Sequence, residues 1–342
     1  MKRFVGSFFR IGQKQGELLR RNQVTLDKIT VDSKLFRRQL SAYKRHYPEL
    51  LEEFEGMAQS AKLDKDKLIY KLITAEIRWS ISKLRPPWNK ACTIFGVKNG
   101  NGAIVGRNYD WTPETEKVFQ PYIIANRDRN AFIGITDMDI GDPTDGGRAP
   151  FFYNADDAIN DKGLFIGLTY AHHDEWSYGI VSTHLTKMVS ETCETVEDAL
   201  AVFRRVPLCF PKNYFVSDRH GNMAVIEHTS RKYKVVYGES GVLIQTNHYV
   251  DSELSRADRV LIHNPTTNTY LRYYEVLREI NRRRDQLKLS DVIQILGNRE
   301  LRVCQNEPKM KTIWSLALDM TKRRYRLYWN LFRERRGRYL VL

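Results

Sequence analysis

The stretch that most restricts the fold is residues 92–111, CTIFGVKNGNGAIVGRNYDW, in which apolar and β-branched residues flank an Asn-Gly turn. An Asn-Gly pair between two such runs is the strongest short-range signal of a β-hairpin. The sequence therefore predicts two antiparallel strands joined by a two-residue turn, and the fold has to place this hairpin in a sheet.

The register of this hairpin places a cysteine beside a run of polar residues. With the turn at residues 100–101, Cys92 faces Tyr109, and moving the turn centre by one residue changes its partner to Arg107 or Trp111. Each register brings Cys92 next to the polar groups at the root of the second strand. Because side chains two residues apart on a strand share a face, Arg107 and Tyr109 point the same way.

The segments on either side predict separate groups of helices and strands. Residues 1–90 show the helical spacing of apolar residues and end at the helix-breaking RPPW of residues 85–88. Helices are also expected at 189–206, 270–286 and 288–298, with a meander of strands at 213–248. Strands joined by hairpins favour antiparallel sheets with helices outside them, whereas a doubly wound parallel sheet needs strict alternation of strands and helices. The predicted fold class is α+β.

The chain is strongly basic, with a formal net charge of +14 and a pI of about 9.5. Residues 322–338 alone hold eight basic residues and one acidic residue. This excess is typical either of a solvated basic face or of a contact for an anionic partner such as nucleic acid, a membrane surface or a phosphorylated cofactor. No helix-turn-helix, zinc-finger, aromatic RNA-binding or glycine-rich phosphate-binding motif accompanies it.

The cysteines predict neither a zinc site nor a disulfide framework, because no two form a C-x-x-C pair; they are Cys92, Cys193, Cys209 and Cys304. We expect no metal and no cofactor. No window approaches the roughly 18 apolar residues of a membrane span. The first apolar run is broken at Arg10 and is too short for a signal peptide. These features predict a cytoplasmic protein without a transmembrane segment.

Cys92 needs a base if it is to act as a nucleophile. A nearby arginine would favour the thiolate, and His172, His173 and His248 follow strand-like segments and could accept a proton. No cysteine-protease signature surrounds Cys92, however. Cutting the bond before Cys92 would create another base, because a free α-amine has a pKa of about 7.7–8.0 and can take the thiol proton near neutral pH. Asp110 could then hold the resulting ammonium.

The sequence ACTIFGVKNGNGAIVGRNYDW resembles the start of the mature chain in N-terminal-nucleophile hydrolases that cut linear amide bonds. This group includes choloylglycine hydrolase, penicillin V acylase and acyl-coenzyme A:6-aminopenicillanic acid acyltransferase. The likeness to the acyltransferase family is greatest, because that family also carries a helical pro-segment. It continues through NDKGLFIGLTY, LIQTNHYV and the helix around Arg272, and so covers most of the chain.

The resemblance implies a four-layer αββα sandwich at 92–342, a helical pro-segment at 1–91 that packs on it, and autocatalytic cleavage between Ala91 and Cys92. By motif, Cys92 would be the nucleophile, Arg107 would lie against the thiol, and Asp110 would orient the α-amine. The two oxyanion donors would come from Asn247 and from the position of Thr169. Choloylglycine hydrolases carry asparagine at the position of Thr169. The second donor therefore departs from their pattern unless it is a backbone N–H.

A further family arginine has two candidates in this chain. The SRADR motif at residues 255–259 favours Arg256, whereas the spacing from Asn247 favours Arg272. The residue before the expected cleavage also differs, since the acyltransferase has glycine where this chain has Ala91, which is also small.

Two functions of different classes follow. The first is an amide hydrolase or acyltransferase that acts through an S-acyl-Cys92 intermediate on a small-molecule amide or acyl donor, with water or an amine as second nucleophile and acyl-CoA as a conceivable co-substrate. The second is a catalytically inactive relative that binds nucleic acid or a membrane through its basic surface, and strongly salt-dependent binding to polyanions would identify it. A homo-oligomer is compatible with both.

Overall fold

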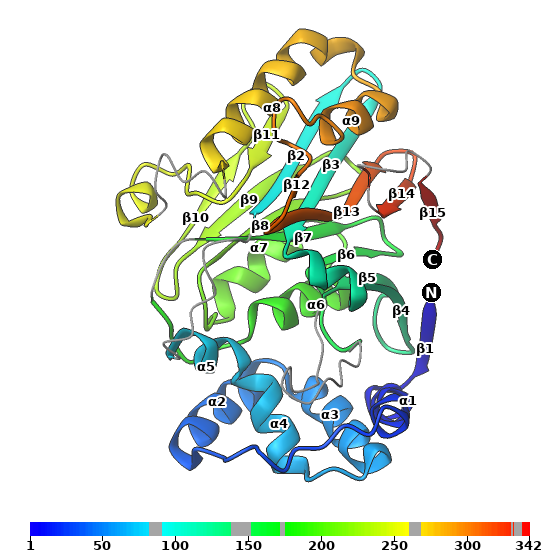
Figure 1. The fold of residues 1–342 in the computed structure, drawn as a ribbon, viewed down its shortest axis with the longest axis vertical. Coiled ribbons are helices and arrows are strands. Elements are labelled where there is room, and N and C mark those ends of the chain that lie inside the picture. The colour runs from blue at the N-terminus through cyan, green and yellow to red at the C-terminus, as the bar shows by residue number, and fades with distance from the viewer. Residues whose placement is uncertain (82–90, 138–151, 172–174, 260–267, 330, 332–336) are drawn as a thin grey trace.

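The computed structural model describes residues 1–81, 91–137, 152–171, 175–259, 268–329, 331 and 337–342. Two β-sheets face each other, helices cover the outer face of each sheet, and the helices of the N-terminal segment pack beneath one of these helical layers (Figure 1). The RPPW boundary predicted at residues 85–88 lies outside the described residues.

The larger sheet has eight strands in the order β1-β4-β5-β6-β7-β8-β9-β10. The strands from β4 to β10 pair antiparallel with their neighbours, whereas β1 lies parallel to β4 at the edge. Their bounds are β1 Lys2–Gly6, β4 Gln120–Asn126, β5 Phe132–Thr136, β6 Asp157–Asn160, β7 Phe165–Tyr170, β8 Lys212–Ser217, β9 Met223–His228 and β10 Tyr233–Tyr237.

The smaller sheet has seven strands, which run in the order β11-β2-β3-β13-β14-β15 with β12 beside β13, and all their pairings are antiparallel. Their bounds are β2 Ala91–Asn99, β3 Gly102–Trp111, β11 Val242–Gln245, β12 Asn306–Glu307, β13 Met310–Asp319, β14 Arg324–Trp329 and β15 Arg338–Leu340. The hairpin that dominates the sequence therefore lies at the centre of this sheet.

The described helices form three groups. The N-terminal group is α1 Phe8–Arg21, α2 Ser33–His46, α3 Pro48–Ala61, α4 Lys65–Ile73 and α5 Ala75–Ile81. The larger sheet is covered by α6 Ser182–Thr192 and α7 Val196–Arg205, and the smaller sheet by α8 Thr269–Arg283 and α9 Leu289–Leu296. Short 3₁₀ helices connect these elements: η1 Pro113–Lys117, η3 Leu254–Ala257 and η4 Arg284–Gln286.

Three apolar layers hold the sandwich together. One lies between the sheets, where residues such as Ile94, Ile133 and Leu316 interdigitate. A second lies between the larger sheet, its helices and the N-terminal segment, and a third between the smaller sheet and α8–α9. The order helix, sheet, sheet, helix confirms the predicted α+β class and αββα architecture.

Three local predictions need correction. The helix expected at 189–206 is two helices, because Thr195 caps the start of α7 through a reciprocal capping box with Asp198. The meander expected at 213–248 divides, since its last strand, β11, pairs with β2 in the opposite sheet. The mainly helical N-terminal segment also contains a strand, β1, whose extended backbone is fixed by pairing with distant β4.

Close packing of α1 on α3 organises the N-terminal segment. A Cβ added at Gly12 would lie 1.8 Å from the Glu53 carbonyl oxygen, and one at Gly16 would lie 2.2 Å from the Met57 carbonyl oxygen. Only glycine allows the two helix backbones to approach this closely. The approach sets Gln15, between the two glycines, against the side chain of Glu53.

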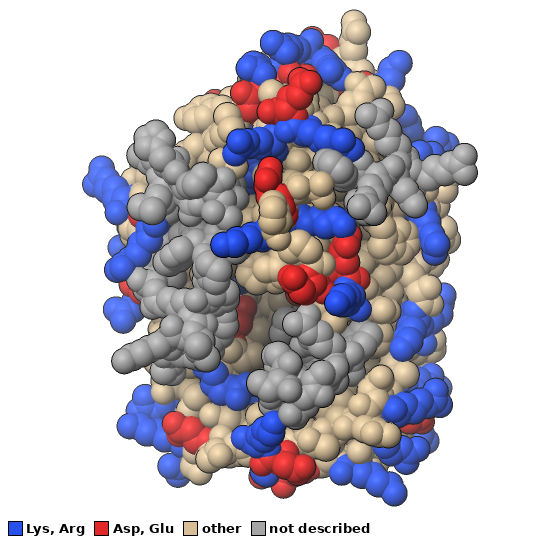
Figure 2. All heavy atoms as spheres, in the orientation of Figure 1, with Lys and Arg blue, Asp and Glu red and all other residues tan. Residues whose placement is uncertain are grey.

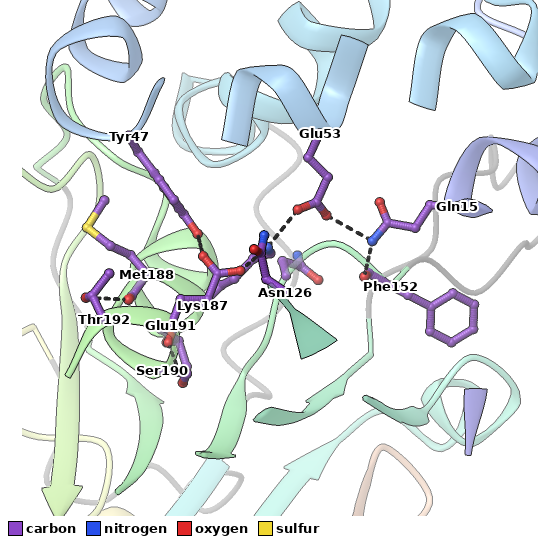
Figure 3. Close-up of polar contacts among 12 residues, drawn as sticks. Gln15, Tyr47, Glu53, Asn126, Phe152, Lys187, Met188, Ser190, Glu191 and Thr192 are labelled. Carbon is purple, nitrogen blue, oxygen red and sulfur yellow. Dashed lines mark hydrogen bonds and ion pairs between the residues drawn. The ribbon is translucent and has the colours of Figure 1, made fainter. Parts of the chain in front are cut away.

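A buried charge cluster joins the N-terminal segment to α6 (Figure 3). Lys187 donates to Glu53 of α3 at 2.8 Å and to Glu191 of its own helix at 2.6 Å, and all three side chains are fully buried. Tyr47 also donates to Glu191, and Gln15 donates to Glu53 at 2.9 Å. The segment thus supplies half of the carboxylates that balance Lys187.

Basic side chains are spread over the face shown in Figure 2, with acidic groups between them. Between the paired strands β14 and β15, the guanidinium of Arg326 lies 4.5 Å from the ring centre of Tyr339, and that of Arg338 lies 4.7 Å from the ring centre of Trp329. These two arginines therefore make cation–π contacts within the chain. Within the described ranges, no helix is both long enough and apolar enough to cross a membrane.

Candidate active site

Cys92 is the second residue of β2, and its side chain is buried between the two sheets. The predicted register is confirmed, because β2 and β3 pair around the turn at residues 100–101 and Cys92 faces Tyr109. The ring of Tyr109 is also buried, and its hydroxyl donates to Asp137 at 2.5 Å. The thiol thus lies in the layer between the sheets, at the root of the central hairpin.

Arg107 leaves β3 on the same face as Cys92 and reaches the larger sheet. Its Nε donates to the carboxylate of Asp157 on β6 at 3.0 Å, and its Nη2 donates to the carbonyl of Leu168 on β7 at 2.9 Å. Burial alone would lower the pKa of Arg107, but the Asp157 carboxylate and the Cys92 thiol raise it above its ordinary value. Arg107 is therefore a permanent cation beside the thiol.

The backbone nitrogen of Cys92 also has a dedicated polar partner. It donates to Oδ1 of Asn247 at 2.7 Å, while Nδ2 of Asn247 donates to the Tyr170 carbonyl at 3.0 Å. The backbone N–H of Asn247 is held in turn by the hydroxyl of Thr269 at 2.8 Å. A side-chain amide carries two N–H donors, and within the described part of the chain only one of those on Asn247 has a partner, so the other is left for a substrate oxygen.

Of the two candidates for the further arginine, Arg272 on α8 is the one that reaches Cys92. It donates to the Cys92 carbonyl, to the Thr93 hydroxyl at 2.8 Å and to Oδ1 of Asn247 at 2.8 Å. Arg256, the alternative from the SRADR motif, lies exposed in η3. The structure therefore brings Arg272, and not Arg256, together with Cys92 and Asn247.

Asp110 comes directly after Tyr109 on β3 and pairs across the hairpin with Ala91. Its side chain therefore points to the other face of the sheet from the thiol, toward the helices. Its Oδ1 accepts a hydrogen bond from the Thr312 hydroxyl at 2.6 Å, while Oδ2 is buried without a hydrogen-bond partner. Burial raises the pKa of Asp110 to about 6, against the opposing effects of the Arg272 charge and the Thr312 hydrogen bond. A cation next to Asp110 would satisfy this oxygen.

Thr169 lies at the end of β7 and is buried. Its hydroxyl donates to the carbonyl of Thr246 at 2.6 Å, so this hydroxyl is already engaged. Since Thr246 precedes Asn247, the contact fixes the backbone that carries the Asn247 amide. An oxyanion donor from Thr169 would have to be a group other than its hydroxyl proton.

The histidines considered as bases have different settings. His248 is buried, with Nδ1 within 3.0 Å of the Thr246 hydroxyl and 2.9 Å of the Thr269 hydroxyl, and its ring packs on Tyr270. These contacts hold the turn next to Asn247. His172 and His173 lie outside the described residues.

Three residues that touch this site were not predicted from the sequence. Asp157 anchors Arg107, Thr269 holds the Asn247 backbone, and Thr312 binds Asp110. Each lies far along the chain from the group it contacts, so no local motif or spacing signals it. No group of three or more His, Cys, Asp or Glu suited to a metal ion occurs among the residues that the structure describes.

This fold and site define the class of the protein. A buried thiol beside a cation, a polar pocket around the backbone nitrogen of the same cysteine and a free amide donor suit nucleophilic attack on a carbonyl. The αββα sandwich is that of the N-terminal-nucleophile hydrolases. The chain belongs to the acyl-coenzyme A:6-aminopenicillanic acid acyl-transferase family, whose model matches residues 97–334.

Solved structures support the fold at low sequence identity. Penicillin V acylase from Agrobacterium tumefaciens is 15% identical with a TM-score of 0.51, over 70% of this chain and 83% of that one. A variant of conjugated bile acid hydrolase from Clostridium perfringens is 12% identical with a TM-score of 0.50, over 73% of this chain and 92% of that one. No curated protein sequence matches the chain. The family and its neighbours in fold are enzymes of amide hydrolysis and acyl transfer.

Proposed function

We propose that this protein is an amide hydrolase or acyltransferase that cuts its own Ala91–Cys92 bond and then acts through an S-acyl-Cys92 intermediate. The observation that carries the proposal is the setting of the Cys92 backbone nitrogen. This atom is buried and hydrogen-bonded to the Asn247 side chain, which Arg272 also binds. Any buried backbone N–H needs an acceptor, but here the acceptor is a side-chain amide that a buried arginine also binds, a setting that suits a nitrogen which becomes a catalytic amine.

Self-cleavage would begin with attack of the Cys92 sulfur on the Ala91 carbonyl carbon. The C–N bond breaks, the nitrogen keeps the electron pair and takes a proton, and a thioester between Ala91 and Cys92 forms. Water then hydrolyses the thioester, which leaves a carboxylate on Ala91 and a free thiol and amine on Cys92. Arg272, bound to the Cys92 carbonyl, holds this residue in place during the exchange.

In the mature chain the amine of Cys92 takes the thiol proton, and the thiolate attacks the carbonyl of a small-molecule amide. The remaining N–H of the Asn247 amide stabilises the oxyanion, a contribution of about 2.7–4 kcal/mol for donors of this kind. The Cys92 ammonium protonates the leaving amine, and Asp110 balances its charge. Water or an acceptor amine then takes the acyl group from sulfur, and an acyl-CoA thioester could load the same sulfur.

The N-terminal segment would stay bound after the cut. It supplies the edge strand β1 to the larger sheet and the α3 carboxylate to the buried charge cluster. It also shares one apolar core with the helices and strands of the larger sheet. We therefore expect residues 1–91 and 92–342 to form one particle of two chains.

Intact mass and N-terminal sequencing of the purified protein test this proposal. Wild type should give chains of residues 1–91 and 92–342 that co-elute on size exclusion, and the larger chain should begin with Cys92. The Cys92→Ala variant should remain a single chain. Cys193→Ala, which removes a buried thiol at the end of α6 beside Thr192, is the matched control and should cut like wild type. A wild-type chain that stays at 40.1 kDa with an unreactive Cys92 would refute the proposal.

A further inference from the structure

We propose that Asp157 and Trp314 are positioning residues that hold Arg107 against the nucleophile and fix the two sheets relative to each other at the site. The proposal rests on the proposed function, because Cys92 is taken as the nucleophile. Neither residue belongs to the hairpin, and neither needs to contact the substrate for this role.

Asp157 is built into the larger sheet as an acceptor for the opposite sheet. Its carboxylate is fully buried and accepts from Arg107 Nε at 3.0 and 3.1 Å. Its partner in the neighbouring strand is Gly167, where an added Cβ would lie 2.6 Å from the Asp157 carboxylate and 3.1 Å from Ile94. A side chain at position 167 would therefore push the carboxylate away, so this glycine makes room for the ion pair.

Trp314 contacts Asp157 from the sheet that carries Cys92. It lies on β13 opposite Tyr109, and its ring stacks on that tyrosine with centres 3.7 Å apart. Its indole N–H donates to Asp157 at 2.7 Å. Asp157 is thus held by Arg107 and Trp314, from adjacent strands of one sheet, while it belongs to the other.

These hydrogen bonds determine which N–H groups of Arg107 point toward the thiol. Asp157 takes Nε, and the carbonyls of Asn108 and Leu168 take one donor each on Nη1 and Nη2. An arginine has five N–H donors, so two remain, as far as the described residues show, for the side where Cys92 lies. The carboxylate also offsets the charge of Arg107, which limits how strongly the guanidinium favours the thiolate.

Asp157 therefore has two separable effects on catalysis. Its hydrogen bonds orient Arg107, and its negative charge opposes thiolate formation. Among the described residues, Tyr109 and Arg272 also interact electrostatically with Cys92, whereas Asp110 faces the other side of the sheet. A merely structural ion pair would change stability when removed but would leave the ionisation of the thiol and the turnover of the folded enzyme unchanged.

The test uses the mature two-chain enzyme carrying Asp157→Asn or Trp314→Phe. The readouts are the pH dependence of Cys92 alkylation by iodoacetamide, and kcat and KM for an amide that the wild type hydrolyses. For Asp157→Asn the alkylation profile should move to lower pH, because the charge of Arg107 is no longer offset. Its kcat should fall on the order of 100-fold with KM unchanged, since misplacing a catalytic group by about 1 Å has such an effect.

Trp314→Phe keeps the carboxylate and removes one hydrogen bond to it. The alkylation profile should stay where it is, while kcat falls about tenfold, the size expected for one hydrogen bond to a charged group. Trp329→Phe, on the neighbouring strand β14, is the matched control and should behave like wild type. If Asp157→Asn does not fold, the kcat of Trp314→Phe alone tests the positioning role.

Wild-type alkylation profiles and kcat in both folded variants would overturn the positioning role. The proposed function would survive that result, because it stands or falls with cleavage of the wild-type chain and loss of cleavage in Cys92→Ala.

Discussion

The buried charge cluster offers the sharpest test of how the N-terminal segment is held. It combines one cation, Lys187, with two carboxylates, Glu53 and Glu191, so it carries one excess negative charge. Burial raises the pKa of Glu53, because the attraction of Lys187 does not outweigh the lost hydration and the repulsion of Glu191. Removing the cation and removing one carboxylate should therefore have very different effects.

Lys187→Met leaves two buried carboxylates without their cation, whereas Glu53→Gln leaves the Lys187–Glu191 pair intact. Breaking a buried ion pair from one side costs about 3–5 kcal/mol. At about 2 °C per kcal/mol, the lower end for large domains, Lys187→Met should lower Tm by about 6–10 °C. Methionine fits sterically, since Lys187 packs near the rings of Phe8 and Phe132. Glu53→Gln should change the free energy of unfolding by less than about 1.5 kcal/mol.

Both variants should be made in the Cys92→Ala background, which keeps one chain, and unfolding followed by calorimetry and circular dichroism at several pH values. A raised folded-state pKa means that the contribution of Glu53 is fully present below its ordinary pKa of 4.5 and is lost as pH rises through the folded value. The stability of Glu53→Gln relative to its parent should thus increase with pH over that window. Equal Tm values for Lys187→Met and Glu53→Gln, or a difference from the parent that does not depend on pH, would refute this reasoning.

Three further predictions concern the site. Arg272→Met should slow self-cleavage on the order of 100- to 1000-fold in a mass-spectrometric time course, because it loses the contacts to Cys92 and Asn247, while exposed Arg256→Met should stay within about twofold. With an Asp110 pKa of about 6 in the uncut chain, the cleavage rate should rise as pH increases from 5 to 7 and the carboxylate ionises, and Asp110→Asn should lose this rise. Thr169→Val should reduce kcat only about fivefold, the size of one neutral hydrogen bond. Asn247→Ala should reduce kcat on the order of 100- to 1000-fold, because it removes an oxyanion donor. Equal losses of kcat would show that the Thr169 hydroxyl does more than hold Thr246.

The hairpin could be predicted in detail because its information is local. An Asn-Gly turn limits which residues can face each other, so twenty consecutive positions left Tyr109, Arg107 and Trp111 as partners of Cys92, and the structure has Tyr109. Capping side chains are local signals too, as Asp64 is for the start of α4 and Thr195 for that of α7. These signals act over a few residues and survive in any tertiary context.

Contacts between elements that are distant in the sequence could not be predicted in the same way. The turn before β11 looks like the other turns of the meander, yet β11 pairs with β2 in the opposite sheet. The choice between Arg256 and Arg272 likewise depended on which arginine the packing of α8 turns toward Cys92. Sequence spacing could name both candidates, but only the assembled layers decide between them.

The site also shows why its chemistry would depend on a completed fold. The Cys92 nitrogen is held by a residue 155 positions away, and the Cys92 carbonyl by one 180 positions away. Arg107 takes its orientation from Asp157, which lies in the other sheet. A chain with only its central hairpin formed would have the thiol and the arginine but none of these partners. Self-cleavage at Cys92, if it occurs as proposed, would therefore report that the two sheets and α8 have assembled, and partly folded chains should remain uncut.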